Sequence, residues 1–230
     1  MLRAEHVSKS FCVGRGRNTK IQAVLDVSLE INKGEHLGLV GESGCGKSTL
    51  ARMLAGLIRP DGGTVLLDGQ DIQKLPVKAR KEFRRKVQII FQNPQQAFHP
   101  RMKLYETLAE PIRLFHLVET REQERLMLEE AMERMGLTTD IFGRYPHEIS
   151  GGQAQRIALL RSLMLEPKVL IADEPTSMLD VSVQAQILKL IRQTTEENEI
   201  ALLLISHDMD VIRAMSDKVI FMHESALNLN

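Results

Sequence analysis

Short apolar runs alternate with amphipathic stretches along most of this chain. The apolar runs predict strands over 37–40, 64–67, 87–91, 169–172, 201–205 and, as the last strand, 218–222. Apolar residues at helical spacing predict helices over 50–55, 104–114, 120–135, 151–165, 181–197 and 208–215. Strands that alternate with helices in this order favour an α/β fold, with a mainly parallel sheet covered by helices on both faces.

The N-terminal part follows a different pattern. Segments 4–11 and 28–31 have the composition of strands, and the glycine- and arginine-rich stretch 13–19 between them predicts a turn. We therefore expect an antiparallel β region at the start of the chain. Further along, the proline and glycines of 59–63 predict another turn, and 76–85 predicts a short basic helix.

Residues 92–145 contain no strand-like run, which predicts a helical subdomain inserted into the α/β core. Gly136 predicts the end of its second helix. The moderately apolar face of that helix consists of Leu126, Met127, Glu130, Ala131 and Met135. We interpret 1–230 as a single domain, with 1–91 and 166–230 as the core and about 92–165 as the helical subdomain.

The composition excludes several classes of protein. Lysine and arginine total 30, and aspartate and glutamate also total 30, so the chain lacks the basic charge of a nucleic-acid-binding protein. No apolar run approaches the roughly 20 residues that span a bilayer, and the N-terminus does not resemble a signal peptide. Cys12 and Cys45 are too few for a disulfide framework or a structural zinc site. We expect a cytosolic protein.

The most specific motif lies at 41–49, between a predicted strand and a predicted helix, and fits the phosphate-loop pattern G-x-x-x-x-G-K-S/T. Its glycines let the backbone turn tightly and direct N–H groups at phosphate oxygens. Lys47 supplies a positive charge for the β- and γ-phosphates, and Ser48 supplies a hydroxyl for Mg²⁺. The predicted nucleotide-binding residues of this loop are Gly41, Glu42, Ser43, Gly44, Cys45, Gly46, Lys47, Ser48 and Thr49.

Two carboxylates follow the apolar strand 169–172. In phosphate-loop NTPases an acidic residue at the end of such a strand holds the Mg²⁺ shell, which assigns Asp173 to the metal through water. Glu174 points elsewhere and is the candidate base that activates the attacking water. Two acids that merely cap a strand are the alternative, which the phosphate loop upstream disfavours.

Ser150, Gly151 and Gly152 mark a second helix start with open backbone amides, although one nucleotide rarely needs two such sites from one chain. Together with Gln153 they resemble the signature motif of the ATP-binding cassette (ABC) ATPases, with Ile149 in place of the commoner leucine. The whole chain resembles one nucleotide-binding domain of that family. The resemblance implies a P-loop NTPase fold of the ABC type, with ATP and Mg²⁺ as cofactors.

Further motifs of the family occur in order along the chain. Phe11 matches the aromatic residue that stacks on adenine, and Gln92 matches the glutamine that senses Mg²⁺ and the γ-phosphate. Asp180 matches the aspartate of the D-loop, and His207 matches the switch histidine. Met178 replaces the commoner alanine of the D-loop, a change that removes no polar group. The resemblance therefore implies an active ATPase.

The family mechanism implies a head-to-tail dimer of two cassettes around two ATP molecules. In such a dimer the signature residues 150–153 of one subunit contact the γ-phosphate held by the phosphate loop of the other. Glu174 would polarise the attacking water, and His207 would hold this water and the γ-phosphate in line. The dimer closes with ATP and opens after hydrolysis.

The segment 91–102 is similar to the corresponding run of the peptide and nickel importer branch. Within it the chain most resembles the shorter, second ATPase of nickel or metal-chelate systems. The C-terminal cysteine cluster of many peptide-importing members is missing, which favours the compact member of a pair and does not identify the cargo. The branch implies a peripheral protein on the cytoplasmic face of the membrane. Its implied partners are a second ABC ATPase subunit in a heterodimer, two integral-membrane permease subunits and an extracytoplasmic solute-binding protein.

Several alternatives stay open. Nickel, a metal–chelator complex and short peptides are all candidates for the cargo, in that order. An exporter ATPase is the first alternative to an importer. A soluble cassette ATPase of the DNA-repair or ribosome-associated type is less favoured, because the balanced charge argues against a nucleic-acid partner.

Overall fold

The computed structural model describes residues 1–13, 19–223 and 226–229, so most of the turn predicted over 13–19 lies outside the described residues. The chain forms two compact units. The first, here called the core unit, contains Met1–Ile89, Lys168–Glu174 and Thr195–Asn230. The second, here called the helical unit, contains Ile90–Pro167 and Pro175–Thr194. The predicted subdomain boundaries at 92 and 165 stay a prediction.

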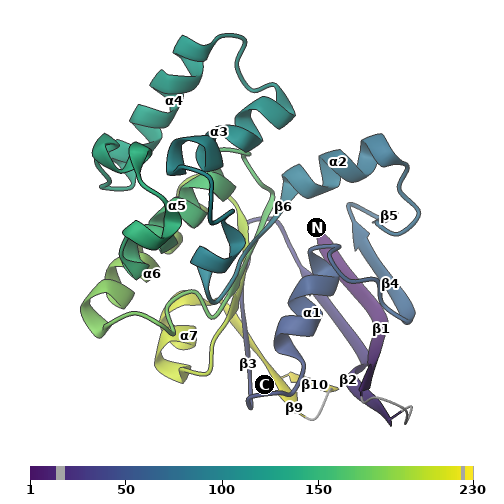
Figure 1. The fold of residues 1–230 in the computed structure, drawn as a ribbon. Helices are drawn as coiled ribbons and strands as arrows, with labels where there is room; N and C mark the ends of the chain where they lie inside the picture. The colour runs from purple at the N-terminus through teal and green to yellow at the C-terminus, as the bar shows by residue number, and fades with distance from the viewer. Residues whose placement is uncertain (14–18, 224–225, 230) are drawn as a thin grey trace. The chain divides into compact units, whose positions relative to one another are not determined.

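The antiparallel β region is present in the core unit (Figure 1). Its strands have the order β2 (Thr19–Ile31), β1 (Leu2–Val13), β4 (Gly62–Leu67) and β5 (Gln70–Asp71). The second strand begins at Thr19, well before the predicted residue 28. In this part of the strand Val24 and Val27 are fully buried, but Ile21 and Leu25 are about half exposed, at 51% and 52%. The register with β1 also shifts here, so the regular alternation that predicts a strand is broken.

The second sheet carries the predicted parallel strands. Its order is β10 (Ala226–Leu229), β9 (Lys218–His223), β3 (His36–Gly41), β8 (Ala201–Ile205), β7 (Val169–Asp173) and β6 (Val87–Ile90). The pairs β3–β8, β3–β9 and β7–β8 are parallel. The prediction that the strand over 218–222 is the last one was wrong, because β10 follows it and pairs with β9 in antiparallel fashion.

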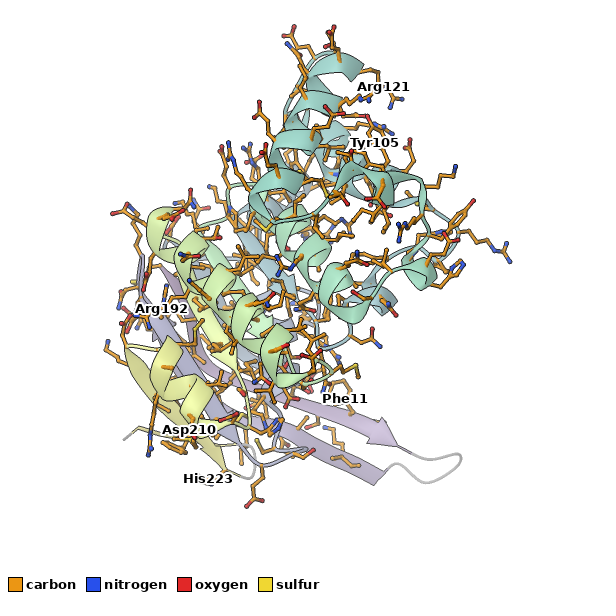
Figure 2. The ribbon with its side chains drawn as sticks, turned by 90° about the vertical axis from the view of Figure 1, so that its left-hand side faces the viewer. Phe11, Tyr105, Arg121, Arg192, Asp210 and His223 are labelled. Carbon is orange, nitrogen blue, oxygen red and sulfur yellow. The ribbon has the colours of Figure 1, made fainter. Side chains whose placement is uncertain are left out.

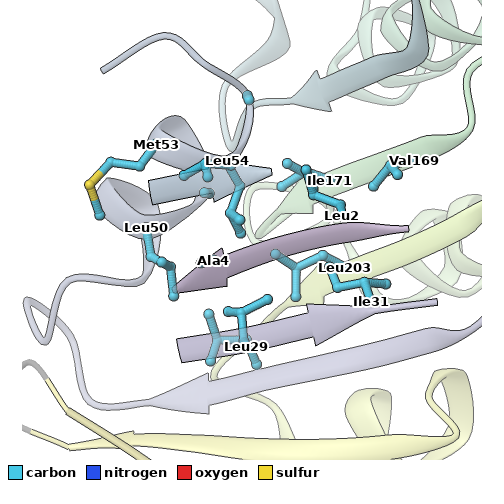
Figure 3. Close-up of a cluster of buried hydrophobic side chains, with 14 of the residues drawn as sticks. Leu2, Ala4, Leu29, Ile31, Leu50, Met53, Leu54, Val169, Ile171 and Leu203 are labelled. Atoms are coloured by element: carbon cyan, nitrogen blue, oxygen red, sulfur yellow. The ribbon is translucent and has the colours of Figure 1, made fainter. Parts of the chain in front are cut away.

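A continuous apolar cluster joins the two sheets of the core unit to α1 (Lys47–Leu54) (Figure 3). Leu37 and Leu39 of β3 point into this cluster, as the alternation of a strand requires. Gly38 between them faces α7 (Met209–Met215), where an added Cβ would lie 2.6 Å from Ile212. The sheet is therefore covered by α1 and the antiparallel strands on one face and by α7 on the other.

The helical unit has the predicted helices, and no strand lies within 92–165 among its described residues. They are α3 (Leu104–Phe115), α4 (Arg121–Arg134), α5 (Gly151–Leu163) and most of α6 (Val181–Glu197). Short 3-10 turns η1 (Pro94–Ala97), η2 (Thr139–Gly143) and η3 (Pro146–Glu148) connect them. The α4 helix ends before Gly136, which has a φ of 62° as the predicted stop requires.

The predicted apolar face of α4 was only partly correct. Met135 is buried as predicted, but Leu126 is 53% exposed, and the helix instead buries Leu128, Met132 and, unexpectedly, the side chain of Glu124. Arg113 of α3 donates from Nε to Glu124 Oε2 at 2.6 Å, and Tyr105 donates to Glu124 Oε1 at 3.0 Å. These bonds compensate the charge and lower the pKa of Glu124 to about 2, with the bond from Arg113 as the largest cause.

The basic helix predicted over 76–85 is α2 (Val77–Lys86), which belongs to the core unit. Pro76 precedes its first turn, where the fixed φ of proline suits a helix start. Across the described parts of the chain, every helix is too short or too polar to cross a bilayer.

Candidate functional site

Backbone sterics hold the phosphate loop in the core unit. Gly46 has a φ of 106°, and a Cβ there would overlap the carbonyl oxygen of Ala23. A Cβ at Gly41 would overlap the carbonyl oxygen of Met222. Gly44 has a φ of 84° with open space around it, so glycine is needed there only for its left-handed backbone conformation. The loop therefore needs glycine at three positions for two different reasons.

The loop leads directly into α1, and its lysine is folded back over it. Among the described residues, no side chain caps the start of this helix at Gly46, so its first amides stay open to a ligand. Lys47 is only 6% exposed and donates from Nζ to the carbonyl oxygens of Gly41 and Glu42, at 2.7 Å each. Its Nζ also lies 3.7 Å from Cys45 Sγ. The charge of Lys47 thus stays within the loop.

The hydroxyl of Ser48 meets the carboxylate that ends β7. Ser48 Oγ donates to Asp173 Oδ1 at 3.1 Å. Burial raises the pKa of Asp173, and the bond from Ser48 and the charge of Arg52 oppose this rise. No sequence motif predicted a role for Arg52 at this site, although it stands one helical turn after Ser48 on α1.

Glu174 and His207 follow the ends of two neighbouring strands. Asp173 of β7 and Ile205 of β8 are paired in the sheet, and the backbone N–H of Glu174 donates to the carbonyl oxygen of Ile205 at 3.0 Å. Glu174 Oε1 lies 3.5 Å from His207 Nδ1. The φ of Glu174 is 47°, a left-handed value that costs a residue with a side chain roughly 1–2 kcal/mol. Such local strain is typical of functional positions.

The parallel topology explains why these residues gather. The phosphate loop follows β3, the carboxylates follow β7 and the histidine follows β8, and the three strands are parallel neighbours in the order β3–β8–β7. Their carboxyl ends therefore share one edge of the sheet, where ligands bind in open α/β sheets. The structure brings together the predicted loop, Ser48, Asp173, Glu174 and His207 within one unit.

Phe11 lies on β1, in the other sheet of the core unit, where it pairs with Ile21 of β2 (Figure 2). Its ring is 39% exposed, and Lys9 Nζ lies 5.7 Å from the ring centroid. A cation next to an exposed ring is compatible with a stacking platform for a base. No described contact joins Phe11 to the phosphate loop.

Gln92 and the D-loop meet in the helical unit. Gln92 Nε2 donates to Ser177 Oγ at 3.2 Å, a contact that the motif spacing did not predict. Asp180 accepts hydrogen bonds from the backbone N–H of Val183 at 3.0 Å and from Ser182 Oγ at 2.8 Å. These bonds lower the pKa of Asp180 and fix it at the start of α6.

The signature residues form a capped helix start in the same unit. Ser150 Oγ accepts from the backbone N–H of Gln153 at 3.2 Å, and Gln153 Oε1 accepts from the backbone N–H of Ser150 at 3.0 Å. This reciprocal pair is a capping box. A Cβ at Gly152 would lie 2.8 Å from a methyl group of Val183 in α6, and one at Gly151 would lie 3.1 Å from Leu179. The two glycines therefore let the D-loop and α6 pack closely on this helix start.

Comparison with known proteins gives a consistent result. The family model described as ABC transporter matches residues 24–177. The chain is 42% identical over 226 residues to the di/tripeptide transport ATP-binding protein DppF of Pseudomonas aeruginosa, covering 97% of this chain and 70% of the relative. It is 41% identical to the oligopeptide transport ATP-binding protein OppF of Haemophilus influenzae, covering 97% of this chain and 69% of the relative.

Solved structures agree with the sequence relatives. A dimeric ATP-binding cassette in a post-hydrolysis state bound to ADP and Pi is 26% identical, with a TM-score of 0.88 over 100% of this chain and 98% of the other. A dimeric bacterial ABC transporter cassette matches with the same TM-score at 28% identity, over 99% and 97% of the two chains. These matches confirm the predicted fold class.

Proposed function

Because the chain belongs to the ABC transporter family, in which it is an ATP-hydrolysing cassette, we propose that it drives an importer of short peptides. ATP binding follows from the family, and the role of each residue is part of the proposal. The open amides of the phosphate loop and Lys47 would hold the β- and γ-phosphates. Phe11 would stack on the adenine ring. The observation that carries the ATPase part of the proposal is the gathering of the phosphate loop, the carboxylates and the histidine at one edge of the parallel sheet, and the relatives support the importer part.

The residues at the end of β7 fit Mg²⁺. The hydroxyl of Ser48 and the carboxylate of Asp173 are hard oxygen donors, 3.1 Å apart and next to the phosphate loop. Ser48 would bind the ion directly, Asp173 through water, and Gln92 would add its side-chain oxygen. When bound, Mg²⁺ would neutralise the negative charge that develops on the transferred phosphoryl group. Its binding would replace the bond between Ser48 and Asp173.

Glu174 is the proposed base for hydrolysis. Its carboxylate would take a proton from the attacking water while the water oxygen bonds to the γ-phosphorus and ADP leaves as the other product. His207, 3.5 Å from Glu174, would hold this water and the γ-phosphate in line. Glu174 lies next to His207, whereas Asp173 accepts a hydrogen bond from Ser48, so the two neighbouring acids would serve different tasks.

A second copy of the cassette fold is required to use the signature residues. Ser150, Gly151, Gly152 and Gln153 offer an anion site at the start of α5, which would contact the nucleotide of a partner subunit. We propose that this partner is a second ABC ATPase in a heterodimer. Two membrane permease subunits and an external solute-binding protein would complete the importer, with this chain on the cytoplasmic face of the membrane.

We propose peptides as the cargo in preference to nickel. The relatives named above are di/tripeptide and oligopeptide transport proteins, and neither is named for nickel or a metal chelate. This reverses the order expected from the sequence, in which nickel and a metal–chelator complex came before short peptides. Cargo would meet the membrane subunits and the solute-binding protein, so the ATPase site itself does not select it.

The change Glu174→Gln tests the catalytic assignment. The loss of a general base lowers a rate typically by 10²–10⁴-fold, so we expect ATP turnover to fall at least about 100-fold while ATP affinity is retained. The variant should also accumulate as an ATP-bound closed dimer in size-exclusion chromatography. Glu129→Gln, a change at a half-buried residue of α4 that belongs to no part of the nucleotide site, is the matched control and should leave turnover unchanged. Normal turnover in the Glu174→Gln variant would show that another group is the base.

The importer assignment has its own test. Glu174→Gln protein with ATP is used to capture partners from detergent-solubilised membranes, and co-purifying chains are identified by mass spectrometry. Two membrane subunits and a second cassette ATPase are the expected result, and their solute-binding protein is then assayed for peptides and nickel. Recovery of exporter-type membrane subunits, or of ribosomal or DNA-associated proteins alone, would overturn the importer assignment without affecting the ATPase chemistry.

A further inference from the structure

The helix α2 concentrates positive charge to a degree that ATP hydrolysis does not explain. Residues 74–86 contain seven lysines and arginines and one glutamate. The rest of the chain then has 23 basic and 29 acidic residues, so this one segment balances an otherwise acidic protein. None of these seven residues belongs to the nucleotide site described above.

One side of α2 is packed and the other is open. Phe83 is 4% exposed and lies against the turn at Gly56, where an added Cβ would be 2.7 Å from its ring. Lys78, Arg80 and Arg84 are exposed, and Val77 is 82% exposed at the start of the helix. Figure 1 shows α2 as a separate helix between β5 and β6.

The open side has a regular spacing. Val77, Arg80 and Arg84 stand at i, i+3 and i+7, which places them on one stripe of the helix. Lys78 flanks this stripe. We call these four residues the basic face of α2. Across the described residues, Lys78, Arg80 and Arg84 form no ion pair with a carboxylate.

Helix stability does not account for the basic face. Like charges four residues apart, such as Arg80 and Arg84, destabilise a helix, and a first turn without an acidic residue leaves the helix dipole uncompensated at that end. An apolar side chain exposed among the charges is equally unnecessary for packing, because Phe83 already anchors the helix. Both features call for a ligand outside the chain.

We propose that the basic face of α2 binds the anionic lipid headgroups of the membrane on which the transporter works. Basic clusters on an amphipathic helix bind anionic lipid surfaces, and an apolar residue beside them adds contact with the acyl boundary. Val77 supplies that apolar contact. The lipid contact would supplement the permease contact and raise the local concentration of the ATPase at the membrane.

Two other anionic partners fit less well. Nucleic acid would select an aromatic or hydrogen-bonding platform beside the cations, and the exposed uncharged residue at the start of this stripe is Val77. An acidic segment of a membrane subunit would favour cations that neighbouring groups hold in place. Among the described contacts of these three side chains, Arg80 donates to the carbonyl oxygen of Leu75 at 3.2 Å, and Lys78 and Arg84 have no such bond. A diffuse lipid surface does not require fixed cations.

The test is vesicle flotation with the purified chain. Vesicles of phosphatidylcholine alone are compared with vesicles that contain phosphatidylglycerol in equal part, at low and at high salt. Each Lys or Arg near such a surface contributes roughly fivefold to binding, so Lys78→Gln, Arg80→Gln and Arg84→Gln together should weaken binding on the order of 100-fold. The matched control replaces Arg134, Lys189 and Arg213, three exposed cations elsewhere, by glutamine and should bind within a small factor of the parent.

The outcomes separate the proposals. Binding that requires phosphatidylglycerol, weakens in salt and is lost only in the α2 variant supports the lipid contact. Equal flotation of the two variants, or no preference of the parent for phosphatidylglycerol, overturns it. The proposal is also overturned if the parent protein does not bind vesicles and only the α2 variant fails to co-purify with membrane subunits. The basic face would then bind a protein. The inference rests on the proposed membrane location, and ATP turnover measured in parallel distinguishes its failure from failure of the ATPase assignment.

Discussion

The core unit and the helical unit each contain a glycine-rich helix start, and they hold it by different means. In the core unit the phosphate loop is held by backbone sterics, since Gly41 and Gly46 leave no room for a Cβ beside the carbonyl oxygens of Met222 and Ala23. In the helical unit the signature turn is held by side chains, through the capping box of Ser150 and Gln153. The first start leaves its amides open, and the second already has one amide bonded.

This difference extends beyond the two turns. The core unit depends on apolar strands that alternate into a continuous cluster. The helical unit adds polar devices, namely a second capping box at Thr120 and Gln123 and the buried pair of Arg113 and Glu124 (Tyr105 and Arg121, which also bond to Glu124, are labelled in Figure 2). We therefore expect the core site to be sensitive to volume and the helical unit to be sensitive to polarity and pH.

The largest effect is expected from Gly46→Ala. The new Cβ would overlap the carbonyl oxygen of Ala23 in a backbone conformation of φ 106°, so ATP binding should fall by more than about 4 kcal/mol and become undetectable. Fluorescence titration with a labelled nucleotide measures this. Gly44→Ala is the matched control, because open space surrounds it and only the left-handed strain of about 1–2 kcal/mol applies. Equal losses in both variants would contradict the steric account.

Next in size is the change Glu124→Gln in the helical unit. The change removes the charge of a buried carboxylate that accepts hydrogen bonds from Arg113 and Tyr105. Although Arg113 keeps its second partner, Glu106, the loss should lower the free energy of unfolding by about 3 kcal/mol. Urea denaturation monitored by circular dichroism gives the value. Glu129→Gln breaks the exposed pair with Arg125 and should cost less than about 1 kcal/mol. If Glu124→Gln lowers the free energy of unfolding no more than Glu129→Gln does, the two ion pairs do not differ in their contribution to stability.

The same residue predicts a pH dependence. The pKa of Glu124 is lowered from 4.5 to about 2, so its ionised form stabilises the fold above pH 4.5, and this contribution is lost as the pH falls toward 2. The difference in unfolding free energy between the parent and Glu124→Gln should shrink from about 3 kcal/mol at pH 7 to less than half that at pH 3. Denaturation of both proteins at the two pH values isolates this residue. If the difference in unfolding free energy between the two proteins does not change with pH, the charge of the Glu124 carboxylate does not stabilise the fold.

The smallest expected effect belongs to Ser150→Ala. Loss of the cap should destabilise the fold by about 1 kcal/mol, whereas ATP affinity of the isolated chain should not change. Ser150→Thr keeps a hydroxyl and should retain most of the stability. Thermal denaturation and nucleotide titration of the two variants separate cap from site. A loss of ATP affinity in the isolated Ser150→Ala chain would mean that the two helix starts are not independent.

The sequence predicted elements best where a regular pattern decides the structure. The bounds of β8 agree with the prediction because all five of its residues are buried and apolar, and those of α6 agree although only its middle buries apolar residues. The face of α4 was only partly correct, because burial of Glu124 depends on Arg113, which lies on another helix, and no local pattern reveals such a partner. The strand β10 was missed because it forms by pairing with β9, and such pairing cannot be seen in a short stretch of sequence.

The candidate site divides in the same way. Lys47, Ser48, Asp173, Glu174 and His207 could be found from motifs, because phosphate and metal chemistry restricts the residue types at fixed spacing. The contacts that shape the loop could not be found from the sequence. They are made by the backbone oxygens of Ala23 and Met222, which are present whatever the side chain at these positions. The bond between Gln92 and Ser177 joins residues 85 positions apart and leaves no trace in spacing.

The strand β3, which leads into the phosphate loop, lies between β9 and β8 in the sheet, and this position affects how the chain folds during synthesis. Both neighbours of β3 come from the distant part of the chain, β8 beginning at residue 201 and β9 at residue 218. Parallel pairing across such a separation is slow, and a nascent chain keeps β3 unpaired until those strands emerge from the ribosome. Competence to bind ATP is therefore acquired late in translation, and incomplete chains expose an apolar strand that chaperones have to shield.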